Sequence, residues 1–191
     1  MEEAELLFSQ CGFEGTRVDE IARMAGINKR MIYHHYGSKE GLYQAVLEKN
    51  LMPILQLSNE LLNEELHPEQ MYERLLNVYF DFLSEHRVYV RLVGWEVCSG
   101  GNHLQTIAMR RQAFDQVVHY FELAQRRGQM RPDLCPRALV TVGITLCFAY
   151  FAQMRFIQSF SPEDLECPEQ HRSWKRAVLA LILKGSGLTD A

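Results

Sequence analysis

The side chains with the greatest potential for chemistry lie close together, between positions 28 and 39. Lys29, Arg30, Tyr33 and His34 recur at helical spacing, so a helix here would carry two permanent cations, a phenol and an imidazole on one face. The whole stretch contains three Lys or Arg residues and no acid. Such a face suits phosphate groups and base edges, because both present hydrogen-bond acceptors to cations and polar donors.

Two short helices and a tight turn are expected to position this face. Thr16 is a suitable N-cap, and Asp19, three residues later, completes a capping box at the start of the first helix. Gly26 supplies the left-handed backbone that ends that helix, and we expect Ile27 to plug the turn. Asn28 then caps the second helix. The pattern predicts a helix-turn-helix, a motif that places its second helix in the DNA major groove.

Each residue of this segment receives an expected role. Ile32 and His35 are expected to point inward from the second helix. Phosphate contacts are expected from Thr16, Arg17, Tyr33 and Lys39, the first and last acting through helix N-termini. The candidates for base-edge contacts are Asn28, Lys29, Arg30, Met31 and His34. For Met31, packing against the turn is an equally supported alternative.

The first quarter of the chain resembles the TetR family of bacterial transcriptional regulators. The motifs that carry the resemblance keep a specific order and spacing: Phe8, Gly12-Phe13, Gly15-Thr16, Asp19-Glu20-Ile21-Ala22, Ala25-Gly26-Ile27, Tyr33-His34-His35-Tyr36 and Ser38-Lys39-Glu40-Gly41-Leu42. The resemblance implies a homodimeric repressor that a ligand releases from its operator by altering the spacing of two recognition helices. The alternative within this class is an activator or a ligand-independent regulator. The resemblance also implies a longer first helix preceded by a basic arm, so a truncated chain and a misplaced start at Met1 are both left open.

Net charge argues against DNA binding at first sight. The chain carries −4, and residues 1–50 contain six Lys or Arg residues against eight Asp or Glu residues. Phosphate contact needs a local patch and not a basic total, and four of these acids precede the two motif helices. We therefore expect a small contact surface whose DNA binding depends strongly on salt.

The remainder of the chain predicts helices throughout, and hence an all-α fold. An N-terminal three-helix domain, residues 1–47, would bind DNA, and a larger helical domain, residues 48–191, would bind a ligand and dimerise. Pro53 is expected to kink or end the fourth helix. Apolar spacing predicts a single helix over 104–127. Residues 138–152 are almost wholly apolar but too short to cross a bilayer, so we expect a helix buried on every side.

The partners expected of the larger domain are a second copy of the chain and a small molecule. Helices over 138–157 and 172–184 would pair with their symmetry mates in a four-helix bundle. An apolar or aromatic effector is expected in a space where small residues such as Gly143 oppose large ones. The candidates for its lining are Trp95, Phe114, Val117, Val118 and Phe148, although plain core packing is the commoner role of such residues.

Other classes of function find little support in the sequence. The chain has no Gly-rich phosphate loop and no nucleophile elbow, so we expect no enzyme activity and no cofactor. Cys98 and His103 alone are too few for a metal site. Five cysteines without a CxxC pair, and no secretory signal, favour reduced thiols in the cytoplasm. The alternative from another class is a helical small-molecule-binding protein or enzyme that retains the fold without binding DNA.

Overall fold

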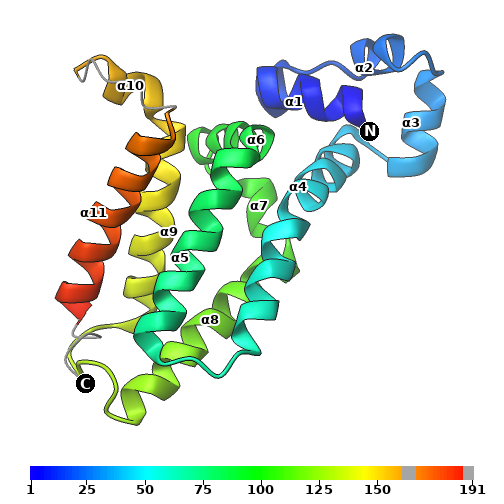
Figure 1. Ribbon diagram of the computed structural model, residues 1–191. Coiled ribbons are helices and arrows are strands. Elements are labelled where there is room, and N and C mark those ends of the chain that lie inside the picture. The colour runs from blue at the N-terminus through cyan, green and yellow to red at the C-terminus, as the bar shows by residue number, and fades with distance from the viewer. Residues whose placement is uncertain (161–166, 187–191) are drawn as a thin grey trace. The chain divides into compact units, whose positions relative to one another are not determined.

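The computed structural model describes residues 1–160 and 167–186, and all regular structure in these ranges is helical (Figure 1). The helices, in chain order, are α1 (Glu2–Gly15), α2 (Val18–Met24), α3 (Lys29–Tyr36), α4 (Lys39–Leu62), α5 (Pro68–Glu85), α6 (Arg87–Cys98), α7 (Asn102–Gln105), α8 (Ala108–Arg126), α9 (Pro136–Ala152), α10 (Met154–Gln158) and α11 (Pro168–Ser186). The expected all-α fold is therefore confirmed.

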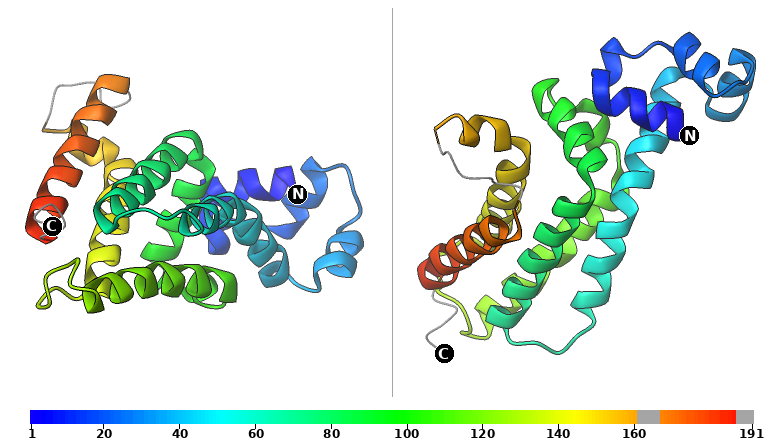
Figure 2. Two further views of the ribbon diagram at one scale, coloured as in Figure 1. Left: turned by 60° about the horizontal axis from the view of Figure 1, so that its bottom comes forward. Right: turned by 45° about the horizontal axis from the view of Figure 1, so that its top comes forward.

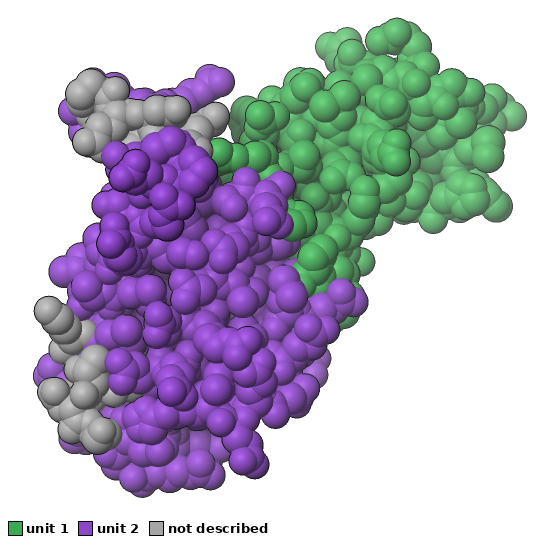
Figure 3. All heavy atoms as spheres, viewed as in Figure 1, with its two compact units in different colours: residues 1–53, 86–111 green, residues 54–85, 112–191 purple. Residues whose placement is uncertain are grey.

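The chain divides into two compact units, coloured separately in Figure 3. Unit 1 consists of residues 1–53 and 86–111, and unit 2 consists of residues 54–85 and 112–191. The helices α6 and α7 therefore pack with the N-terminal helices, although they follow α5 in the sequence. This division concerns packing, and the functional division at residue 47 stays a prediction.

Unit 1 is built on apolar side chains that α1 to α4 turn toward one another. Phe8, Ile21 and Ile32, from three successive helices, are at most 3% exposed. Tyr43 of α4 is fully buried, and its ring lies 4.7 Å from that of Phe8. These contacts fix the short α2 and α3, which are too short to be stable as isolated helices.

Unit 2 is a bundle in which α5 and α11 pack against α9. Both views of Figure 2 show α9 and α11 side by side, and the chain reverses direction between them at α10. The rings of Phe80, Tyr150 and Phe151 form a buried aromatic cluster between α5 and α9. Nearer the start of α5, the buried rings of Tyr72 and Phe121 meet edge to face at 5.6 Å.

Two expectations about the helices need correction. The fourth helix does not end at Pro53, because α4 continues through it, with Leu51 and Ile54 buried on either side. The helix expected over 104–127 is split into α7 and α8. The apolar helix α9 exposes Val142 by 46% and Ile144 by 36% in the single chain, so its expected burial on every side depends on a subunit interface and stays a prediction. No helix in the described part of the chain is long and apolar enough to cross a membrane.

Candidate nucleic-acid interface

The turn between α2 and α3 has the geometry that a helix-turn-helix requires. Gly26 adopts a φ of +63°, which an L side chain would strain, and its N–H donates to the Arg23 carbonyl. The N–H of Ile27 donates to the Ala22 carbonyl at 3.0 Å. Asn28 is the N-cap of α3, and its Oδ1 accepts the N–H of Arg30 at 2.9 Å. The expected turn conformation of Gly26 and the expected capping role of Asn28 are confirmed, and the base-edge role of Asn28 stays a prediction.

The outer face of α3 is open to solvent in the single chain. Arg30 and His34 are exposed, Met31 is 49% exposed and Tyr33 is 42% exposed, whereas Ile32 between them is buried. Two expectations fail here: His35 is exposed instead of pointing inward, and Ile27 is 42% exposed instead of plugging the turn. Both residues sit where the short helices leave too little protein to cover them.

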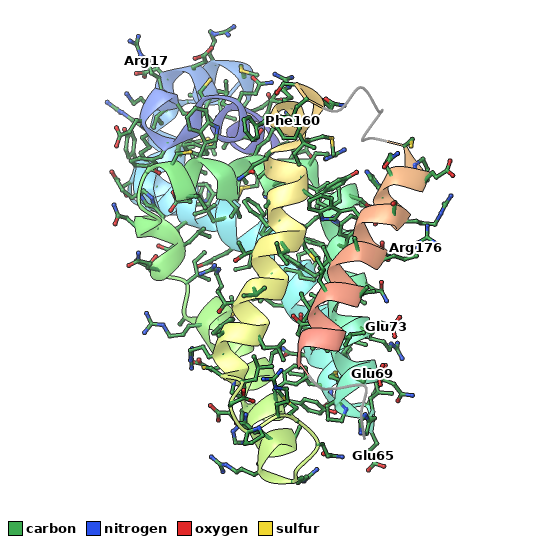
Figure 4. The ribbon with its side chains drawn as sticks, turned by 90° about the vertical axis from the view of Figure 1, so that its left-hand side faces the viewer. Arg17, Glu65, Glu69, Glu73, Phe160 and Arg176 are labelled. Carbon is green, nitrogen blue, oxygen red and sulfur yellow. The ribbon has the colours of Figure 1, made fainter. Side chains whose placement is uncertain are left out.

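Thr16 is not the N-cap of α2 that was expected, whereas its phosphate contact through the helix N-terminus stays a prediction. Arg17 is the N-cap of α2, without a side-chain capping bond, and Thr16 is 3% exposed. The Thr16 hydroxyl donates to the carbonyls of Gly12 at 2.7 Å and Leu7 at 3.2 Å. Its side chain therefore stabilises α1 from within. Arg17 is exposed beside it, and Figure 4 shows its side chain at the outer edge of the unit.

The two expected lysine contacts already have partners within unit 1. Lys29 pairs with Asp19 of α2, and this hydrogen bond raises the pKa of Lys29. Lys39, the first residue of α4, lies with its Nζ 4.4 Å from the centre of the Phe13 ring. Asp19 was not expected to pair with a cation of the next helix; the opposite charges were visible in the sequence, but their distance was not.

The junction of α3 and α4 places the start of α4 directly beside the end of α3. The N–H of Gly41 donates to Ser38 Oγ at 3.1 Å, and a Cβ at Gly41 would collide with the Tyr36 carbonyl oxygen. Only glycine allows this close approach. The carboxylate of Glu40 accepts its own backbone N–H and a hydrogen bond from Ser38, and these bonds lower its pKa.

The residues expected to line a ligand site are divided between the two units. Phe114, Val117, Val118 and Phe148 belong to unit 2, whereas Trp95 belongs to unit 1, where its indole N–H donates to the Ser9 carbonyl. This bond serves the packing of α6 on α1, and the expected role of Trp95 in ligand binding stays a prediction.

Within unit 2, the space beside Gly143 is not open. A Cβ there would collide with the Tyr72 hydroxyl and lie 2.8 Å from Leu76 Cδ2. A separate cleft of about 500 Å³ in this unit is lined by Glu64, Glu65, Leu66, His67, Tyr120, Leu123, Ala124, Arg127 and Gln129, none of which was expected to bind ligand. Among residues 1–160 and 167–186, no group of three or more potential metal ligands was found.

Comparison with known protein families gives two matches. Residues 1–46 match the family described as bacterial regulatory proteins, tetR family. Residues 68–182, more than half of the chain, match the family described as tetracyclin repressor-like, C-terminal domain. The chain belongs to the TetR family. The resemblance seen in the sequence and the two-part helical architecture are both confirmed.

Relatives of this TetR-family protein are named as regulators. It is 28% identical over 183 residues to the HTH-type transcriptional repressor NicS of Pseudomonas putida, covering 94% of this chain and 86% of that protein. It is 29% identical over 188 residues to the biofilm operon icaADBC HTH-type negative transcriptional regulator IcaR of Staphylococcus aureus, covering 96% and 97% of the two chains. The family match and these relatives confirm the predicted function, a ligand-responsive DNA-binding transcriptional regulator.

The fold is shared with solved structures at lower sequence identity. One is the transcriptional regulator FadR from Bacillus subtilis in complex with stearoyl-CoA, with a TM-score of 0.76 at 15% identity and 96% of each chain covered. Another is the putative transcriptional regulator SCO4942 from Streptomyces coelicolor, with a TM-score of 0.71 at 19% identity, covering 97% and 94% of the two chains.

Proposed function

We propose that this TetR-family protein is a dimeric repressor that a small molecule releases from its operator DNA. Residues 1–47 bind DNA in this proposal, residues 48–191 bind the ligand and dimerise, and the protein acts in the cytoplasm. The observation that carries the proposal is the outer face of α3, which exposes Arg30, Tyr33 and His34 and contains no acidic residue. A surface of this kind suits a polyanion such as DNA.

The contacts divide into those that orient the protein and those that read sequence. Arg17, Tyr33 and Lys39 are proposed to contact phosphates. Base edges are assigned to Asn28, Lys29, Arg30, Met31 and His34. Arg30 is the strongest candidate among them, because its guanidinium can bind O6 and N7 of a guanine together. Asn28 already uses its Oδ1 to cap α3, which leaves its amide NH₂ for a base acceptor.

Dimerisation is assigned to α9 and α11, which lie side by side on one face of unit 2 (Figure 4). Their exposed apolar residues in the single chain are Val142 and Ile144 on α9 and Leu181 on α11, the last at 72% exposure. A two-fold contact between two copies would bury these residues in a four-helix bundle. The expected ranges, 138–157 and 172–184, are kept in this proposal.

The effector is proposed to be a small apolar or aromatic compound that binds along α8 and α9. Phe114, Val117 and Phe148 are half-buried there, and the Arg137 guanidinium lies 5.3 Å from the centre of the Phe114 ring. Binding would change the separation of the two recognition helices. That separation must be about 34–36 Å for both helices to enter successive major grooves.

Selection of duplexes from a random-sequence pool tests the DNA-binding half of the proposal. Wild-type protein should enrich a two-fold symmetric site. Arg30→Ala should weaken binding to the enriched duplex by about tenfold or more, and should weaken binding to random DNA much less. Arg126→Ala, which removes an exposed arginine from α8, is the matched control and should bind like wild type. Unchanged affinities of Arg30→Ala for both duplexes would remove α3 from the interface.

The alternative, a helical binding protein or enzyme that keeps the fold without binding DNA, gives a different result. Such a protein would enrich no sequence from the pool at any salt concentration. Native mass spectrometry of the purified protein addresses the effector in either case. A co-purified compound added to the duplex complex should release DNA if the repressor proposal is correct.

A further inference from the structure

The C-terminal end of α6 is packed into the same compact unit as the DNA-binding helices (Figure 1). Trp95 and Glu96 lie about fifty positions beyond the end of the matched DNA-binding region at residue 46. The Trp95 side chain nevertheless reaches α1, and the Glu96 side chain reaches α7. They have no role in the proposed DNA contact surface, so their placement requires a separate explanation.

Trp95 fits a kink in α1. Gly12 interrupts the helical backbone with φ +69° and ψ −177°. A Cβ at Gly12 would lie 2.9 Å from Trp95 Cδ2, so the absence of a side chain makes room for the indole. The indole N–H donates to the Ser9 carbonyl at 3.2 Å, and Thr16 Oγ1 donates to the Gly12 carbonyl at 2.7 Å. The kink is therefore held by α6 and by the residue that follows α1.

Glu96 is a buried carboxylate with several donors around it. It is 1% exposed, and its Oε2 accepts the N–H groups of His103 at 3.0 Å and Leu104 at 3.2 Å. Its Oε1 lies 3.0 Å from Nδ1 of the His103 ring. A buried carboxylate is tolerated only when such bonds replace its hydration. Glu96 therefore fixes both the backbone and the ring of His103.

The His103 ring in turn contacts one helix on each side of the helix-turn-helix. Its centre lies 4.6 Å from that of Phe13, near the end of α1, and 5.0 Å from that of Tyr43 in α4. Tyr43 is fully buried, and burial together with the nearby Glu96 carboxylate raises its pKa. The chain of contacts from Glu96 thus ends on α1 and α4, which flank α2 and α3 in the sequence.

We propose that Trp95 and Glu96 are positioning residues for DNA binding: from α6 they hold the kinked α1 and the start of α4 in the geometry that aims α3. The inference rests on the proposed function, because it concerns the affinity of the same interface. Helix α2 packs on both α1 and α3, and α4 begins three residues after α3 ends. A loosened α1 or α4 therefore leaves α3 free to adopt orientations that do not fit the groove.

Three full-length variants test the proposal. Trp95→Phe keeps a ring over Gly12 but removes the N–H donor, and Glu96→Gln keeps the shape but removes the charge. Val97→Ala is the matched control on the same helix, since Val97 is 66% exposed. DNA affinity is measured on the duplex that wild type selects. Amide hydrogen exchange is measured in parallel in α1, α4 and the remote helix α9.

Trp95→Phe and Glu96→Gln should each weaken DNA binding by about fivefold or more, the factor expected for one lost hydrogen bond. Exchange should accelerate in α1 and α4 and stay unchanged in α9, and Val97→Ala should match wild type throughout. Wild-type affinity in both variants would overturn the proposal. Equal acceleration in α9 would overturn it as well, because the residues would then support the whole fold. Failure of wild type to select any duplex would instead overturn the proposed function.

Discussion

Lys29 Nζ lies 2.9 Å from each carboxylate oxygen of Asp19, and this ion pair joins α2 to α3 across the helix-turn-helix. Both side chains are exposed, at 42% for Lys29 and 75% for Asp19. The pair therefore adds little to stability. Its effect falls on the proposed DNA surface, because Asp19 neutralises one of the two cations that open α3. A base edge that binds Lys29 must compete with this carboxylate.

Asp19→Asn should therefore tighten DNA binding, by up to about fivefold at moderate salt. Removal of the carboxylate frees Lys29 for its proposed base-edge contact and takes one negative charge away from the DNA surface, so the salt dependence of binding should steepen by about one released counterion. Fluorescence anisotropy titrations at several salt concentrations measure both quantities. Glu20→Gln removes a neighbouring acid that pairs with no cation in the described structure, and it should have a smaller effect. An equal gain in DNA affinity from both variants would show that the affinity responds to net charge alone and not to the release of Lys29.

Dimer formation should depend on the exposed apolar residues of α9 and α11. Leu181→Glu places a charge where the proposed two-fold contact excludes water, so the variant should lose its partner. Light scattering at micromolar concentration should then give a mass near 22.2 kDa, against twice that value for wild type. Leu57→Glu, at a 40% exposed leucine of α4, should remain dimeric. A wild-type mass of one chain would remove α9 and α11 from the proposal as an interface.

Gly143 should resist substitution because Tyr72 and Leu76 occupy the space beside it. Alanine normally stabilises a helix relative to glycine by up to about 1 kcal/mol. Here the added methyl group collides with the Tyr72 hydroxyl, which donates to the Leu139 carbonyl at 2.9 Å. Gly143→Ala should lower the free energy of unfolding by about 1–3 kcal/mol. Gly94→Ala in α6 meets nothing within 4 Å and should be neutral or stabilising in the same urea titration.

The buried thiol of Cys147 should be protected from alkylation in the folded protein. Burial raises its pKa to about 12, and the thiolate is the reactive form. Iodoacetamide at pH 8 should therefore label the exposed Cys11, Cys98 and Cys135 and leave Cys147 intact until the chain unfolds. Peptide mass spectrometry with and without urea measures this directly. Rapid labelling of Cys147 in the native state would contradict its placement in the core.

The same pKa shift makes stability depend on alkaline pH. The unfolded thiol has an ordinary pKa of 9.0, whereas the folded thiol holds its proton to about pH 12. The stabilising difference is complete below pH 9 and is lost as the pH rises from 9 toward 12. Cys147→Ala should therefore show a weaker fall of the free energy of unfolding across that window.

Local rules predicted the helix-turn-helix well. Gly26 and Asn28 act through backbone conformation and a single short-range hydrogen bond, so their roles follow from the residues themselves. The prediction that Thr16 caps α2 was wrong because its hydroxyl can bond to either of two groups. It was expected to cap α2, but the kink at Gly12 presents a carbonyl within its reach, and the fold uses that acceptor.

The position of α6 could not be predicted from local rules, because it depends on which helices pack together. One signal was nevertheless present. Tyr89, Leu92, Val93 and Glu96 follow the spacing of a buried helical stripe, and the last member is charged. A carboxylate at such a position implies dedicated hydrogen-bond donors, but their identity, in this case His103 and Leu104, depends on the fold.

Hydroxyl-radical footprinting of the duplex that wild type selects tests the central claim most directly. A dimer that places α3 of each copy in the major groove should protect two symmetric segments. Their centres should lie about one helical turn apart, or a whole multiple of it, and Arg30→Ala should give no protection at the protein concentration that just saturates the wild-type footprint. A single protected segment, or protection spread evenly along any duplex, would contradict the account of this protein as a dimeric, operator-specific regulator.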